Sequence, residues 1–208
     1  MGILSALGRR WWLHVAAAVV TLAIGFTLGD RMGDAELVRA SFHDIRVIHP
    51  VEYLKLITPE APEVVELARQ LGSVEEAYAF VRDRIAFEPS APAGTPAQIL
   101  RERRASCLGK ATLLASLCRA LGIPAGSIRV VIGQLTLEDS LVEHAWVDLE
   151  YGSQCLQLDP TDLLGTHDFL RFPGNEYSRS FVSRELFCFN DEGFAVVSQL
   201  NRLKGRHP

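Results

Sequence analysis

The fold of this chain is limited first by two strand-like segments, residues 143–151 and 154–161, which are neighbours in the sequence. Only Gly152 and Ser153 separate them, and such a pair is typical of the two-residue turn of a β-hairpin. A turn of this length pairs Tyr151 with Gln154 and runs the two strands antiparallel. The sequence therefore predicts a fold that contains an antiparallel sheet.

The same register brings a histidine and an aspartate together. Asp159 falls opposite Trp146, and His144 shares the face of Trp146 because it lies two residues away. Diagonal neighbours of this kind have Cα atoms about 7–8 Å apart, within reach of a hydrogen bond between imidazole and carboxylate. A four-residue loop keeps this arrangement, whereas a three-residue loop would break it.

Residues 106–125 predict an apolar helix that begins at Cys107 and ends at Gly122, with Pro124 just beyond. The first N–H groups of a helix lack intrahelical partners and carry the positive end of the helix dipole. They therefore favour a thiolate over a thiol and can donate to an oxyanion. Lys110, one turn further, adds a positive charge near the sulfur. The alternative is a buried structural cysteine, which is the commoner place for a thiol in an apolar helix.

The remaining elements are predicted from periodicity and capping. Two helices are expected, with Ser73 as the N-cap of the second and Glu76 completing a capping box. A second hairpin is expected around residues 190–193, and the segment after the Asp159 motif is expected to be irregular. The bounds are 63–71 and 74–85 for the helices, 127–134 for a strand after the cysteine helix, 185–197 for the hairpin and 163–183 for the irregular segment.

Cys107, His144 and Asp159 are the parts of an activated nucleophile: a thiol, a base and a carboxylate that orients the base. Candidates for binding the substrate or its oxyanion are the neighbouring residues Ser106, Lys110 and Trp146. The three principal groups could instead ligate a metal, but the chain has no CxxC or HExxH pattern. No metal and no other cofactor is therefore expected.

These motifs resemble those of the transglutaminase-like superfamily, namely Cys107 in RRASCLGKA, His144 in EHAWV and Asp159 in LDPT. The similarity extends over about residues 63–164 and includes LCRALGIPA, which ends the cysteine helix. It implies an α+β, papain-like core, with the nucleophile helix packed on an antiparallel sheet. Among the members it points to the bacterial cysteine peptidase type. One departure is Ala105-Ser106 before the cysteine, where the family often has a Gly-x-Cys pattern.

The N-terminal part differs in composition from the rest. Residues 11–28 carry no formal charge, follow Arg9 and Arg10, and are long enough to cross a bilayer. The positive-inside rule then places the following domain outside the cytoplasm, and a cleaved signal peptide is the alternative to a retained signal anchor. The predicted organisation is an anchor at 1–30, a connecting arm at 31–62, a catalytic domain at 63–200 and a tail at 201–208.

The distribution of charge limits the possible binding partners, and the cysteine content limits the possible disulfides. All 25 acidic residues follow residue 28, whereas two of the 21 basic ones precede it, so nucleic acid is not an expected partner. Cys155 and Cys188 lie in different predicted strands and are either free or paired. The expected function is that of a thiol hydrolase acting on peptide or isopeptide-type amides, held to the membrane by the N-terminal helix. A non-catalytic scaffold or binding module and an amine-transferring crosslinker remain as alternatives.

Overall fold

A five-stranded antiparallel sheet forms one half of the α+β fold in the computed structural model, which describes residues 50–137, 140–165 and 168–196. The strand order is β5-β4-β3-β6-β7. The strands are β3 (Ile128–Leu137), β4 (Ser140–Tyr151), β5 (Gln154–Leu158), β6 (Val182–Phe189) and β7 (Phe194–Val196). The predicted class, helices with an antiparallel sheet, is confirmed.

The β4–β5 hairpin has the register that its turn predicts. Tyr151 pairs with Gln154, and the ladder continues without a shift to Val147 and Leu158. Gly152 adopts a φ of +63°, a left-handed conformation that costs a glycine little. Because β5 ends at Leu158 while β4 continues to Ser140, His144 lies beyond the end of β5.

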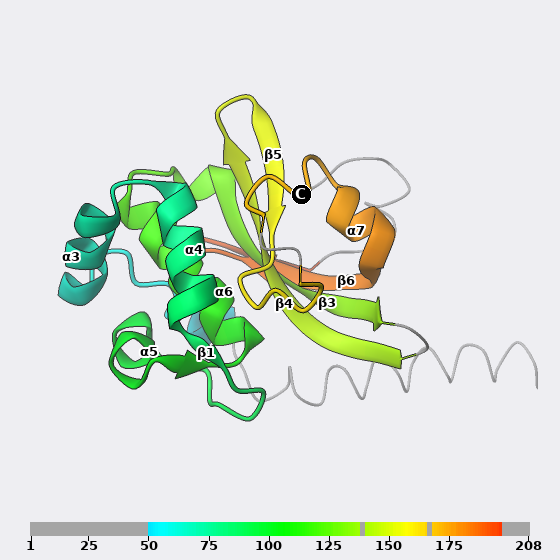
Figure 1. The fold of residues 1–208 in the computed structure, drawn as a ribbon, viewed down its shortest axis with the longest axis horizontal. Coiled ribbons are helices and arrows are strands. Elements are labelled where there is room, and N and C mark those ends of the chain that lie inside the picture. Colours follow the sequence, from blue (N-terminus) through cyan, green and yellow to red (C-terminus); the bar gives the residue numbers. More distant parts are fainter. Residues whose placement is uncertain (1–49, 138–139, 166–167, 197–208) are drawn as a thin grey trace, which may run out of the picture. The chain divides into compact units, whose positions relative to one another are not determined.

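Helix α6 (Cys107–Ala120), which begins at the candidate nucleophile, packs between the sheet and the other helices (Figure 1). Ser106 caps its first turn, accepting a hydrogen bond from the N–H of Gly109, and Gly122 follows its last turn with a φ of +94°. The flanking helices are α3 (Pro62–Leu71), α4 (Val74–Arg84) and α5 (Pro96–Glu102). The predicted N-cap at Ser73 is present, since its hydroxyl accepts from the N–H of Glu76.

A short helix, α7 (Glu176–Phe181), lies on the side of the sheet away from α6 (Figure 1). The prediction of an irregular segment at 163–183 missed this helix, which is too short to show a helical period. Other short elements complete the fold: α2 (Pro50–Leu54), β1 (Ala86–Phe87), β2 (Arg104–Ala105) and the 3-10 turn η1 (Ala125–Ser127).

The beginning of the domain differs from the predicted boundary at residue 63. Tyr53, within the predicted arm, is buried and packs against three phenylalanines of the sheet. Its ring centroid lies 4.9 Å from that of Phe187, 5.0 Å from that of Phe189 and 5.8 Å from that of Phe194. The chain from Pro50 onward therefore belongs with the sheet. The predicted span at 11–28 falls outside the described residues, and none of the helices described from residue 50 to 196 has the length and apolarity that a membrane span requires.

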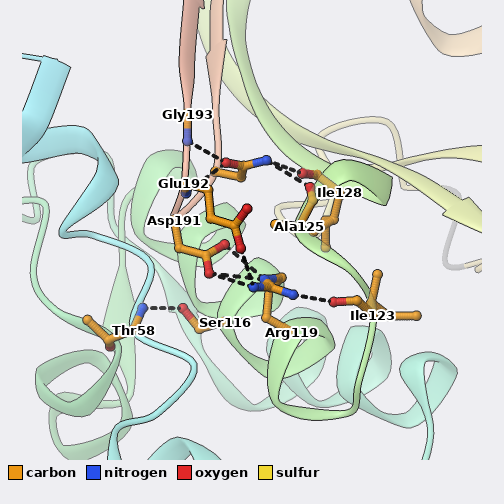
Figure 2. A network of polar contacts seen from close by, with 10 residues as sticks. Thr58, Ser116, Arg119, Ile123, Ala125, Ile128, Asp191, Glu192 and Gly193 are labelled. Atoms are coloured by element: carbon orange, nitrogen blue, oxygen red, sulfur yellow. Dashed lines mark hydrogen bonds and ion pairs between the residues drawn. The ribbon is translucent and has the colours of Figure 1, made fainter.

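The far end of α6 is fastened to the β6–β7 turn (Figure 2). Arg119 donates to both carboxylate oxygens of Asp191, at 2.9 and 3.1 Å from its Nε, and to the carbonyl of Ile123 at 2.7 Å. Ser116, one turn earlier, accepts a 3.1 Å hydrogen bond from the N–H of Thr58. These contacts fix α6 at the end opposite Cys107.

Candidate active site

Cys107 is the first residue of α6 and has a half-buried, free thiol. The turn that carries it packs closely on α5 and β2. A Cβ at Gly109 would lie 2.9 Å from the Cβ of Ala105 and 3.1 Å from the Cδ1 of Ile99. A glycine is therefore required two residues after the cysteine for this packing. As predicted, Cys107 lies at the start of a helix, where the main-chain N–H groups have no intrahelical acceptor.

His144 and Asp159 form the hydrogen bond that the hairpin register predicts. Nε2 of His144 lies 3.0 Å from Oδ1 of Asp159, and the two side chains are only 1% and 6% exposed. Because Nε2 is taken by the carboxylate, Nδ1 is the ring nitrogen left for another partner. Cys107 is the second side chain that acts on the imidazole, since it helps to raise the pKa of His144.

The protonation of His144 follows from these contacts. Burial alone lowers the pKa of the imidazole, but its hydrogen bond to Asp159, its interaction with Cys107 and the charges of both residues outweigh burial. The net effect raises the pKa of His144 to about 9. With this pKa the imidazole carries a proton at neutral pH, next to the side chain of Cys107.

Asp159 is held by more donors than the sequence indicated. The N–H of Thr161 donates to Oδ1 at 2.9 Å, and the hydroxyl of Tyr177 donates to Oδ2 at 3.2 Å. The hydroxyl of Tyr78 donates to the main-chain carbonyl of Asp159 at 3.2 Å. The spacing Asp-x-Thr could have indicated the turn at Thr161. Neither tyrosine had a sequence signal, because each comes from a different helix, far along the chain.

The ammonium group of Lys110 is bound at the carboxyl end of α4. Its side chain is buried, and Nζ donates to the carbonyls of Arg82 and Ile85 at 3.1 and 2.9 Å. Burial lowers the pKa of this ammonium, while the charge of Asp159 opposes that shift. Lys110 therefore binds the carboxyl end of α4. The prediction that it binds substrate or oxyanion does not hold in the structure, because the ammonium is enclosed and engaged.

Trp146 is likewise inside the fold. The residue is fully buried, and its indole N–H donates to Asp148 at 3.1 Å. Its ring packs against Tyr177, with centroids 5.6 Å apart. It therefore supports the site from beneath and has no surface for a substrate, contrary to the prediction. Ser106 is the helix cap, and its predicted contact with substrate or oxyanion stays a prediction.

The other three cysteines are free thiols. Cys118 is completely buried, and desolvation raises the pKa of its thiol to about 12. Cys155 and Cys188 do not pair, because β4 and β3 lie between their strands. Cys155 is exposed, whereas Cys188 is buried and has its pKa raised by that burial. Within residues 50–196 as described, no three His, Cys, Asp or Glu side chains are grouped as a metal site.

The candidate site is thus a cysteine at a helix start beside a buried histidine–aspartate pair, on an α+β fold. Residues 63–160 match the family model described as the transglutaminase-like superfamily, so this segment is similar to the core of that superfamily. The resemblance in the sequence motifs is thereby confirmed. The match covers Cys107, His144 and Asp159 but ends before Tyr177.

Solved structures with a similar arrangement include LapG of Legionella pneumophila in its calcium-bound form. It shares 15% identity at a TM-score of 0.48, over 65% of this chain and 75% of that chain. The EGTA-treated form of LapG shares 17% identity at a TM-score of 0.46, over 72% and 73%. A proposed cysteine protease of Cytophaga hutchinsonii shares 16% identity at a TM-score of 0.46, over 71% and 53%. A search of curated proteins finds no match.

Proposed function

We propose that this protein is a thiol-dependent acyl-transfer enzyme, a cysteine peptidase or amidase in which Cys107, His144 and Asp159 form a catalytic triad. The observation that carries the proposal is the buried hydrogen bond between His144 and Asp159, beside a thiol at the start of a helix. A structural cysteine has no need of a charged imidazole, and burying such an imidazole has a free-energy cost that the domain must offset.

In the proposed reaction, the proton of the Cys107 thiol is already on His144 before the substrate binds, which gives the imidazolium described above, and the resulting thiolate attacks the carbonyl carbon of an amide. The N–H groups at the start of α6 donate to the oxygen that becomes negative. His144 then gives its proton to the leaving amine as the C–N bond breaks, which leaves a thioester on Cys107. Water, deprotonated by His144, hydrolyses the thioester and restores the thiol. Asp159 holds the ring throughout and stabilises its positive charge.

The substrates that this chemistry fits are peptide or isopeptide-type amides, and an amine in place of water would make the same protein a crosslinker. We place the reaction outside the cytoplasm, on the argument of the uncharged run at 11–28 behind Arg9 and Arg10. A reporter fused after Pro208 that is active only in the cytoplasm would contradict this location. A mature form beginning near Asp30 would favour a cleaved leader.

The first experiment measures the alkylation of each cysteine by iodoacetamide at pH 6. Cys107 should react at least tenfold faster than Cys155, because only Cys107 has an imidazolium beside it. Cys155 is the matched control, since it is the more exposed thiol of the two. His144→Ala should slow Cys107 towards the rate of Cys155. Equal rates at Cys107 and Cys155 in the unmodified protein would refute the activated thiol.

The second experiment separates an enzyme from a scaffold. A peptide library and amine probes define an amide substrate, and Cys107→Ala should abolish its turnover while the unfolding midpoint stays near that of the wild type. Asp159→Asn should leave a folded protein with greatly reduced turnover. If Cys107→Ala retains the biological activity of the intact protein, the scaffold alternative replaces the enzyme.

A further inference from the structure

The geometry points to Tyr177 as a positioning residue for the proposed triad, acting through the carboxylate of Asp159. This inference rests on the proposed function. The Tyr177 hydroxyl lies 3.2 Å from Oδ2 of Asp159, and the whole residue is buried. It reaches the carboxylate from α7, on a segment that follows the Asp159 motif.

The hydrogen bonds of Asp159 show why this contact matters. Oδ1 accepts from His144 and from the N–H of Thr161, whereas Oδ2 accepts from Tyr177, which is its one donor within the described part of the chain. A carboxylate rotates easily about the bond to its Cβ, and a donor on each oxygen fixes its plane. Without Tyr177, Oδ2 would be a buried acceptor without a partner, and rotation towards a new donor would take Oδ1 away from His144.

Aromatic packing fixes the ring of Tyr177 itself. Its centroid lies 5.6 Å from that of Trp146, 5.1 Å from that of Phe172 and 5.7 Å from that of Phe181. Burial first, and then the charge of Asp159, raise the pKa of the phenol. The hydroxyl therefore keeps its proton, and remains a donor, across the pH range in which the imidazole works.

The helix that carries Tyr177 is tied to the same hairpin as the triad. The amide of Gln157 on β5 accepts from the N–H of Ser178 at 2.9 Å and donates to its hydroxyl at 2.7 Å. The N–H of Gln157 also donates to the carbonyl of Phe172 at 3.0 Å. Because Asp159 lies two residues after Gln157, these hydrogen bonds hold α7, and with it Tyr177, close to Asp159. Tyr177 lies beyond the family match at 63–160.

The test is the pH profile of Cys107 alkylation in the full chain, compared between Tyr177→Phe and Tyr78→Phe. Both variants lose one buried hydroxyl near Asp159, but Tyr78 donates to the main-chain carbonyl and not to the carboxylate. Tyr177→Phe should move the acid limb to higher pH and slow alkylation at pH 6 roughly threefold to tenfold, a part of the worth of a hydrogen bond to a charged group. Tyr78→Phe should lower the unfolding midpoint and leave the acid limb in place.

A double variant and a second single variant complete the test. In an Asp159→Asn background, Tyr177→Phe should have no further effect on alkylation, because its action passes through the carboxylate. If Tyr177→Phe does not fold, Gln157→Ala, which undocks α7, should move the acid limb in the same direction. An unchanged acid limb in the variant that folds overturns the inference, as does an equal shift in Tyr78→Phe. Slow alkylation of wild-type Cys107 would instead refute the proposed function.

Discussion

Substituting Gly133 with alanine should destabilise the sheet directly beneath the candidate site. Gly133 pairs with His144 across β3 and β4. An added Cβ would lie 2.5 Å from the carbonyl oxygen of Arg184 on β6 and 2.7 Å from Cη2 of Trp146. The carbonyl belongs to the backbone and cannot turn aside, so β3 and β6 must separate. Overpacking of this kind costs about 1–3 kcal/mol, and the backbone contact favours the upper end. For a domain of this size that corresponds to a fall in unfolding midpoint of about 2–12 °C.

The measurement is thermal unfolding followed by circular dichroism, with Gly126→Ala as the matched control. A Cβ at Gly126 meets no heavy atom within 4 Å, and its backbone lies outside the left-handed region. Gly126→Ala should therefore unfold within about 2 °C of the wild type, or slightly above it. Equal midpoints for the two variants would refute the argument that the close approach of β6 and Trp146 requires a glycine at position 133.

Three further outcomes follow from single contacts. Lys110→Met should lower the free energy of unfolding in urea by about 2–4 kcal/mol, because two buried carbonyls lose their donor; an unchanged midpoint contradicts this. Arg119→Met should lower it by about 1–2 kcal/mol through the lost bidentate contact with Asp191, and Arg69→Met, which removes an exposed ion pair, is its control. In Cys107→Ala, stability should fall as pH rises above 6.5, because the hydrogen bond to Asp159 and the charge of Asp159 still let His144 keep its proton longer in the folded chain; the fall should be smaller than the ~3 kcal/mol that the full shift to a pKa of about 9 represents. Adding Asp159→Asn should flatten that slope, and a rise in stability over this range would show the opposite sign of pKa shift.

The sequence was sufficient to predict those parts of the site whose geometry is set by residues adjacent in the chain. A two-residue turn at Gly152 fixes the parity of the whole hairpin, so the pairing of His144 with Asp159 followed from counting. The start of α6 could be placed at Cys107 because capping and helix-ending residues lie at both ends of an apolar run. Both predictions depend on neighbours in the chain.

The sequence was insufficient to predict which of two chemically reasonable contacts a side chain makes. Lys110 lies one turn from Cys107, but its long stem carries the charge to the end of α4, a contact across 25 residues. Trp146 shares a strand face with His144, yet α7 covers it, and α7 itself has too few residues to show a period. Tyr177 reaches Asp159 by the same tertiary packing. No local pattern encodes such contacts.

The position of β6 decides how small a fragment of this protein can be made. β6 pairs with β3 on the side away from β4, and both β6 and β7 follow the family-matching segment. A polypeptide that stopped at residue 160 would keep Cys107, His144 and Asp159, but β3 would become an outer strand with bare N–H and C=O groups. Such an edge invites pairing with a second molecule. Soluble fragments for crystallisation or screening should therefore run at least from Pro50 to Val196.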